Sequence, residues 1–223
     1  MQHKPSEVVY KIPELSLVIQ AGGQSQRMGR SKASIPFLGH PLIFQPLKRL
    51  YPLAEEVIIT TNEPANIKQL FEQSEFKSIR YEPDLRRERG ALSGLFTALS
   101  VATKPYVALC ACDMIFASPE LFLYEYKLME QGNFDLVVPF DSNGFEPFHA
   151  IYKRETCLFF VEQALEQGEQ KMSSWFEKAN MCKVDKDDIL KINPQGGAFL
   201  NINTPDQLVH IEKRIAHGDL SSR

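Results

Sequence analysis

A glycine-rich, basic loop directly after an apolar run is the feature that most constrains this chain. Residues 15–32 read LSLVIQAGGQSQRMGRSK, so a segment with the composition of a buried strand runs straight into a loop. The adjacent Gly22 and Gly23 let backbone N–H groups approach an anion without a side chain in the way. Arg27 and Lys32 add positive charge. An ordinary strand-to-helix turn would explain one glycine but not this combination, and the loop therefore predicts a phosphate-binding site.

The spacing within this loop excludes the two commonest phosphate-binding motifs. A Walker A loop has four residues between its glycines and a lysine directly after the second one. Here five residues separate Gly23 from Gly29, and two more separate Gly29 from Lys32. The dinucleotide-binding pattern G-x-G-x-x-G is absent as well. We therefore expect a nucleotide-binding loop of another class.

Composition and charge predict a single cytoplasmic domain. A length of 223 residues suits one large domain or a domain with a small insertion, and we expect a single domain with loose termini at residues 1–11 and 218–223. The net charge of −3 argues against general binding to nucleic acid or acidic membranes. No apolar run approaches the ~18 residues of a membrane span, and the first residues lack a signal-peptide core. The four cysteines have neither zinc-ligand nor C-x-x-C spacing, so we expect reduced thiols.

The alternation of short apolar runs with helical stretches predicts an α/β fold. We expect three layers, with a mostly parallel twisted sheet and helices on both faces. The predicted strands are residues 15–19, 56–60, 78–81, 106–110, 136–139, 149–152 and 198–202. The predicted helices are residues 42–50, 63–72, 92–102, 119–130, 155–167 and 205–216. Ligands of such sheets bind at the carboxyl ends of the strands, which is where the polar residues of this chain gather.

Asp113 is the candidate metal ligand. It follows the apolar residues 107–112, so a buried strand ends in a carboxylate. An unpaired buried carboxylate is costly, and a divalent cation with phosphate oxygens would relieve that cost. Mg²⁺ commonly takes only one or two protein carboxylates. The alternative is that Asp113 caps the helix that begins near Ser118.

Two asparagines near the carboxyl end form a further candidate group. The period of a strand places Asn201 and Asn203 on one face, and Thr204 and Pro205 then start the last helix. The alternative is that Asn203 serves only as a helix cap. His149 invites a catalytic role, but we expect a structural one, because chemistry at a bound phosphate depends on positioning and charge more than on a base. We expect the lone Trp175 to be a packing residue.

The motifs of this chain, and their order along it, resemble those of the molybdenum cofactor guanylyltransferases. This family is also called the molybdopterin-guanine dinucleotide biosynthesis protein A family, and it is part of the nucleotidyltransferase superfamily. The family's first loop reads L-A-G-G-x-S-x-R-M-G-x-x-K. Residues 90–94 (GALSG) are similar to its G-P-L-A-G, residues 112–114 (CDM) to its c-D-m-P, and residues 201–206 (NINTPD) to its N-x-N-T-P-E-D. The chain departs from the family at Gln20, where leucine is usual, and at Ser31, where aspartate is usual. Ile115 also replaces the usual proline.

This resemblance implies a Rossmann-like nucleotide-diphospho-sugar transferase fold and a Mg²⁺-dependent reaction. GMP would pass from GTP to molybdopterin or the molybdenum cofactor, with release of pyrophosphate. Arg27 and Lys32 would act on the triphosphate, Asp113 would bind Mg²⁺, and Asn201 and Asn203 would lie near the acceptor. The implied nucleotide-binding residues are Gln20, Ala21, Gly22, Gly23, Lys32, Thr60, Asn62, Asp84 and Asp113, with Glu82 as the alternative to Asp84. Other cofactor-biosynthesis proteins or molybdoenzymes are candidate partners.

Two other functions stay open on the sequence alone. One is a cytidylyltransferase or another nucleotidyltransferase of the same fold, since a Gln20 side chain turned inward could alter base selectivity. Relatives that attach cytidine usually read A-A-G where this chain has Ala21, Gly22 and Gly23. The more distant one is a non-catalytic nucleotide-binding regulator. It predicts loss of the metal ligand or the loop cation, but Asp113 and Lys32 are both present.

Overall fold

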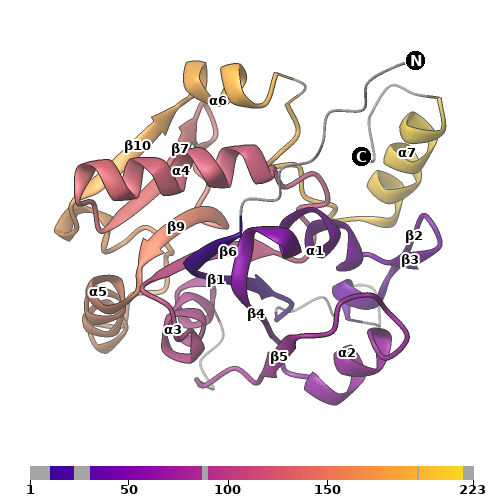
Figure 1. Cartoon of the computed structure of the whole chain (residues 1–223), viewed down its shortest axis with the longest axis horizontal. Coiled ribbons are helices and arrows are strands. Elements are labelled where there is room, and N and C mark those ends of the chain that lie inside the picture. Colours follow the sequence, from indigo (N-terminus) through magenta and orange to yellow (C-terminus); the bar gives the residue numbers. More distant parts are fainter. Residues whose placement is uncertain (1–10, 23–30, 87–89, 195, 218–223) are drawn as a thin grey trace.

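The computed structural model describes residues 11–22, 31–86, 90–194 and 196–217. Its centre is an eight-stranded sheet in the order β10-β7-β9-β6-β1-β4-β5, with β8 paired to β7 (Figure 1). Its strands are β1 (Ile12–Gln20), β4 (Ala54–Thr60), β5 (Ile79–Glu82), β6 (Tyr106–Ala111), β7 (Leu136–Asp141), β8 (Gly144–Phe145), β9 (His149–Lys153) and β10 (Met181–Asp185). A separate hairpin contains β2 (Pro36–Phe37) and β3 (His40–Pro41). Gly23, Arg27 and the two termini beyond residues 11 and 217 lie outside the described residues.

Most of the sheet is parallel. Strand β1 is parallel to both β4 and β6, β4 is parallel to β5, and β7 is parallel to β10. Strand β9 runs antiparallel between β6 and β7. Strand β8 forms a hairpin with β7, as the DSNG sequence at residues 141–144 predicts. The prediction of a mostly parallel sheet is confirmed.

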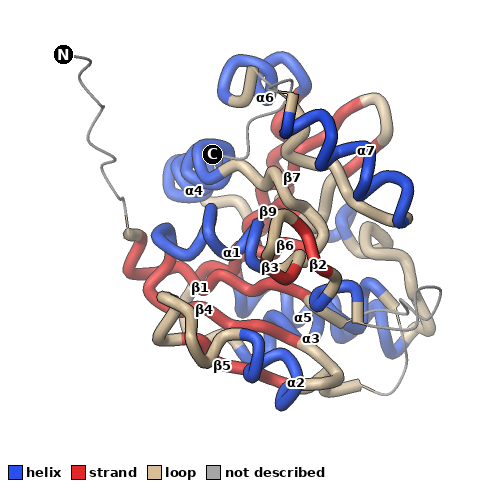
Figure 2. Tube along the Cα trace, turned by 90° about the vertical axis from the view of Figure 1, so that its right-hand side faces the viewer, coloured by secondary structure: helices blue, strands red, loops and turns tan. Residues whose placement is uncertain are grey.

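Helices cover both faces of this sheet (Figures 1 and 2). Side chains alternate along β1, so Leu17 and Ile19 pack in one core with α1 and α4, whereas Val18 packs in the other with α3 and α5. The predicted three-layer α/β architecture is therefore confirmed. In chain order the helices are α1 (Phe44–Leu50), α2 (Pro64–Leu70), α3 (Ala91–Val101), α4 (Pro119–Gly132), α5 (Arg154–Glu166), α6 (Lys186–Ile192) and α7 (Pro205–Ala216). Short 3₁₀ helices span Lys32–Ser34, Tyr51–Leu53 and Phe176–Lys178. Within the described ranges, no helix has the length and apolarity needed to cross a membrane.

The prediction of a strand at residues 198–202 is wrong. Only Asn201 makes an isolated bridge, to Met114, and the segment does not join the sheet. The chain turns at Gly196 and Gly197, both with positive φ, and then passes the end of β6. Both lateral edges of β6 are already paired, with β1 and β9, so no place for another strand remains there. The segment instead packs through Ile202 in a small third core with α7.

Strand β10 and helix α6 were not predicted, and neither were the hairpin strands β2 and β3 or the 3₁₀ helices. Strand β10 is an edge strand in which only Val184 is buried, so it lacks the apolar run that marks the central strands. Helix α6 follows it directly and is seven residues long with one buried side chain, Ile189. Both elements are set by packing against β7 more than by a strong local pattern.

Candidate active site

Three segments that are distant in the sequence meet at the side chain of Lys32. This residue begins the 3₁₀ helix that follows the glycine-rich loop. Its Nζ forms an ion pair with the carboxylate of Asp113 and donates a hydrogen bond to Oδ1 of Asn203, at 2.8 Å. Both partners of the ion pair are mostly buried, with 18% of the Lys32 side chain and 13% of the Asp113 side chain exposed. The loop cation, the proposed metal ligand and one of the two asparagines are thus in direct contact.

Backbone hydrogen bonds hold Asp113 in this place. Strand β6 ends at Ala111, and the N–H of Cys112 then donates to the carbonyl of Gln20 at 3.1 Å. The carbonyl of Asp113 itself accepts from Ile202, which ties the turn after β6 to the segment before α7. The alternative that Asp113 caps α4 is wrong, because the Ser118 side chain occupies that position and accepts from the Leu121 N–H. The Asp113 carboxylate is therefore free of a capping role and faces Lys32.

The oxygens around Lys32 suit a hard cation. The Asp113 carboxylate and the Asn203 amide oxygen both contact one ammonium group, so they converge on one positive charge. Among the described residues, no three or more histidines, cysteines, aspartates or glutamates are grouped so that they could hold a metal ion. A single carboxylate completed by phosphate and water oxygens is a common arrangement for Mg²⁺. The donor set therefore fits Mg²⁺ bound together with a nucleotide.

Asn201 lies near this group but makes no equivalent contact. Its backbone bridges Met114, and its side chain is half-buried. Asn203 is not the cap of α7, because Thr204 accepts from the Gln207 N–H and completes a capping box. The expectation that both asparagine side chains point to one place rested on a strand that is not formed.

A second group of polar side chains lies where β1, β4 and β5 end. The Ala21 N–H donates to the carbonyl of Thr60 at 2.8 Å, which brings the start of the loop beside β4. A Cβ atom on Gly22 would lie 2.9 Å from Oδ2 of Asp84, so the missing side chain lets this carboxylate approach the loop. Burial raises the pKa of Asp84, and a hydrogen bond from Asn62 opposes that shift. Thr60, Asn62 and Asp84 are thus gathered next to the loop.

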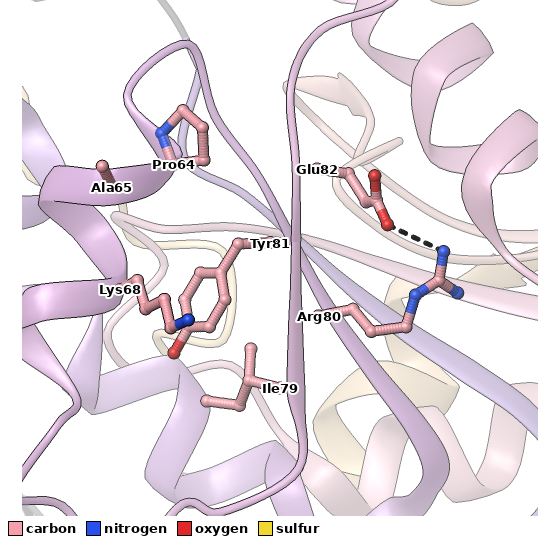
Figure 3. Close-up of a pocket in the computed structure, with 7 residues that line it drawn as sticks. All are labelled: Pro64, Ala65, Lys68, Ile79, Arg80, Tyr81 and Glu82. Atoms are coloured by element: carbon pink, nitrogen blue, oxygen red, sulfur yellow. Dashed lines mark hydrogen bonds and ion pairs between the residues drawn. The ribbon is translucent and has the colours of Figure 1, made fainter.

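Glu82, the alternative to Asp84, is directed elsewhere. Figure 3 shows Glu82 and Arg80 on one side of β5, with Ile79, Tyr81 and Lys68 on the other. Glu82 pairs with Arg80 at 2.8 Å. These residues line an open groove around the edge strand of the sheet. Asp84, and not Glu82, is the carboxylate that meets Gly22.

A buried histidine–glutamate pair supports the turn that carries Asp113. His149 is fully buried, its Nδ1 lies 3.1 Å from Oε1 of Glu125, and its Nε2 accepts from the Ser118 N–H at 3.2 Å. Burial lowers the pKa of His149 to about 3, so the imidazole is neutral. Its ring stacks on Phe122 and meets Phe199 edge-on. This agrees with the structural role expected of His149, but no local pattern identified Glu125 of α4 as its partner.

Trp175 is a packing residue, as expected. Its side chain is fully buried and contacts the rings of Phe160 and Phe176 in the core beneath α5. No face of the indole is free to stack on a pterin. In the loop between β5 and α3, the guanidinium of Arg86 lies over the ring of Phe96.

The region from residue 17 to residue 183 matches the family model described as the MobA-like NTP transferase domain. The chain belongs to this family. The match begins within β1 and ends within β10, and it includes Lys32 and Asp113. This protein is therefore a nucleotidyltransferase, and its site residues lie on the fold that the family shares.

Individual relatives cover nearly the whole MobA-like chain. A probable molybdenum cofactor guanylyltransferase of Pelotomaculum thermopropionicum is 32% identical over 86% of this chain and 89% of the relative. One of Natranaerobius thermophilus is 27% identical over 89% of this chain and 95% of the relative. The crystal structure of molybdopterin-guanine dinucleotide biosynthesis protein A from Archaeoglobus fulgidus superposes with a TM-score of 0.76 at 25% identity, covering 91% of this chain and 99% of that one. A 4-diphosphocytidyl-2C-methyl-D-erythritol synthase from Anaerococcus prevotii shares the fold alone, with a TM-score of 0.67 at 16% identity.

Proposed function

We propose that this protein transfers GMP from GTP to molybdopterin or the molybdenum cofactor and releases pyrophosphate. The names of its full-length relatives support the acceptor and the nucleotide. The single observation that carries the proposal is the contact of Lys32 with both Asp113 and Asn203 at the carboxyl ends of the central strands. A cation and two oxygen ligands at this edge are the groups that a triphosphate and its metal need.

In this reaction the terminal phosphate of the acceptor attacks the α-phosphorus of GTP, and pyrophosphate leaves from the opposite side. The acceptor phosphate is already ionised, so no general base is required, and the protein contributes positioning and charge neutralisation. Lys32 would move from Asp113 to the triphosphate, and Arg27 would add a second positive charge there. The backbone from Gln20 to Gly23 would hold guanine and ribose, through groups other than the Ala21 N–H, which already donates to Thr60.

Mg²⁺ is the metal proposed for this reaction. Asp113 would hold it, with Asn203 beside it. When bound, the metal would neutralise charge on the phosphate oxygens, an effect typically worth several kcal/mol of barrier. Asp113 would then have the cation in place of Lys32 as its partner, and Lys32 would be available for phosphate oxygens.

The guanosine part of GTP would lie against the second polar group. Thr60, Asn62 and Asp84 surround the start of the loop, and these positions match those that hold the nucleoside in the family. Asn201 and Asn203 would face the acceptor. We further propose that the chain works as a single domain in the cytoplasm, beside cofactor-biosynthesis proteins or molybdoenzymes.

Calorimetric titration with GTP, CTP, ATP and UTP, with and without Mg²⁺, tests this function. Selective binding of GTP that Mg²⁺ strengthens supports it, and release of pyrophosphate from GTP in the presence of molybdopterin then identifies the acceptor. A preference for CTP would replace the guanylyltransferase with a cytidylyltransferase. Failure to bind any of the four nucleotides would favour a non-catalytic regulator and refute the proposal.

A further inference from the structure

The carboxamide of Gln20 occupies a buried position between the sheet and helix α3. Gln20 is the last residue of β1, and it pairs in register with Thr60 of β4 and Ala111 of β6. Its side chain follows Val18 by two residues and so points to the face covered by α3. Only 9% of the residue is exposed. The family usually has leucine at this position. This chain has an amide there instead, and that amide lies inside the protein.

Gly94 provides the space for this amide. A Cβ atom on Gly94 would lie 1.6 Å from Nε2 of Gln20 and 2.6 Å from its Cδ. Any side chain at position 94 would therefore displace the carboxamide. Helix α3 has no side chain at position 94, and the carboxamide of Gln20 fills the space that this leaves.

The oxygen of this amide has no partner. Three side-chain oxygens at the ends of neighbouring strands are buried, and none accepts a hydrogen bond within the described part of the chain: Gln20 Oε1, Thr60 Oγ1 and Asp84 Oδ1. A buried polar atom without a partner typically costs about 1–3 kcal/mol. Gln20 and Thr60 are both more than nine-tenths buried, so bulk water does not donate hydrogen bonds to these two oxygens. Such a group of acceptors suits a ligand that presents several N–H donors.

We propose that the side chain of Gln20 is a base-specificity determinant that accepts a hydrogen bond from the Watson–Crick edge of guanine. This inference rests on the proposed function and extends its nucleotide site from backbone contacts to a side chain at a position where the family usually has leucine. Guanine presents the ring N1–H and the 2-amino group next to each other, and both are donors. Adenine presents an acceptor at N1 and no 2-amino group, so its 6-amino group is the one donor on that edge. A site with unpaired acceptors rejects a base without those donors, because its oxygens would stay buried and unpaired.

The test compares the dissociation constants of GTP, ITP and ATP for the wild-type chain and for Gln20→Leu, which has the residue usual in the family. ITP lacks the 2-amino group and keeps N1–H, so it shows which donor is used. We expect Gln20→Leu to bind GTP about tenfold more weakly while its affinity for ATP changes much less, which corresponds to the loss of one hydrogen bond. An unchanged ratio of GTP to ATP affinity in this variant would overturn the inference. Thermal unfolding of both proteins confirms that the variant is folded, which is expected because leucine is apolar at a buried position.

A double-mutant cycle with Gly94 tests the same contact from the helix side. Gly94→Ala should lower the selectivity for GTP in the wild-type background, because the new methyl group displaces the carboxamide. In the Gln20→Ala background the space is free, so the same substitution should have no further effect. Equal effects in both backgrounds would show that Gly94→Ala acts through the helix and not through Gln20, and would overturn the inference.

Different outcomes refute the proposed function and the role of Gln20. A wild-type chain that does not prefer GTP over the other nucleotides refutes both the proposed function and the role of Gln20. A wild-type chain that prefers GTP, combined with a Gln20→Leu variant of the same selectivity, refutes only the role of Gln20.

Discussion

Lys32 and Asp113 form an ion pair although 81 positions separate them in the sequence. Lys32 comes from the loop after β1, and Asp113 comes from the turn after β6, the strand that lies beside β1. The parallel pairing of these strands brings both turns to the same edge of the sheet, and Asn203 approaches from the segment before α7. Because the pair is mostly buried, each charge depends on the other until another ion or a phosphate replaces it.

Substitution of Asp113 should remove catalysis while the fold persists. In Asp113→Asn the metal loses its carboxylate ligand, so we expect turnover to fall about 10²- to 10³-fold, measured as pyrophosphate release from GTP at several Mg²⁺ concentrations. Asp187→Asn, at an exposed position in α6, is the matched control and should retain wild-type rates. Normal Mg²⁺-dependent turnover in Asp113→Asn would refute the role of Asp113 as the metal ligand.

Lys32 should act on the phosphates and not on the nucleoside. Lys32→Ala is expected to weaken GTP binding more than tenfold, because a charge-assisted contact to the triphosphate is lost. The affinity for guanosine should change much less. Calorimetry with the two ligands measures the difference, and Lys68→Ala, in the groove beside β5, serves as the control. Equal losses for GTP and guanosine would contradict the assignment.

A methyl group on Gly22 should act through Asp84. The Cβ atom of Gly22→Ala would lie 2.9 Å from the Asp84 carboxylate, so that carboxylate must move away from the loop. We expect guanosine to bind several-fold more weakly, by direct titration. The double variant Gly22→Ala/Asp84→Ala should then bind no more weakly than Asp84→Ala alone. Additive losses in the double variant would mean that Gly22 and Asp84 contribute separately.

The buried pair of Glu125 and His149 should make stability depend on pH. Burial raises the pKa of Glu125 well above its ordinary value of 4.5, and its Oε2 finds no partner among the described residues. Above about pH 4.5 the unfolded chain releases the proton of Glu125, whereas the folded protein keeps it. The stabilisation from Glu125 is complete below about pH 4.5 and is lost as the pH rises toward the folded-state pKa.

Glu125→Gln separates this effect from other titrations, because glutamine resembles a protonated carboxyl group and does not ionise. Relative to wild type, the variant should gain up to about 1.4 kcal/mol in the free energy of unfolding per pH unit between about pH 5 and the folded-state pKa. Urea unfolding of both proteins across this range measures the difference, and His149 is common to both. Parallel stability curves would show that Glu125 is ionised in the folded protein.

Local patterns in the sequence determined much of this fold, because apolar residues recur with one period along a half-buried strand and with another along a half-buried helix. The apolar run that became β1, the capping residues Ser118 and Thr204, and the turn at residues 141–144 were all predicted from short segments. The candidate residues Lys32 and Asp113 were also recognised there. Asp113 directly follows an apolar run, Lys32 ends the loop that follows another, and the carboxyl ends of parallel strands share one edge.

Tertiary structure alone decided which of these residues touch and which segments join the sheet. An alternating segment such as residues 198–202 becomes a strand only where a neighbouring strand has a free edge, and β6 has none. The partner of His149 lies 24 positions away on another element, so no local pattern could identify it. The contact of Gln20 with Gly94 likewise depends on how closely α3 packs on β1, a distance set by side chains throughout the core.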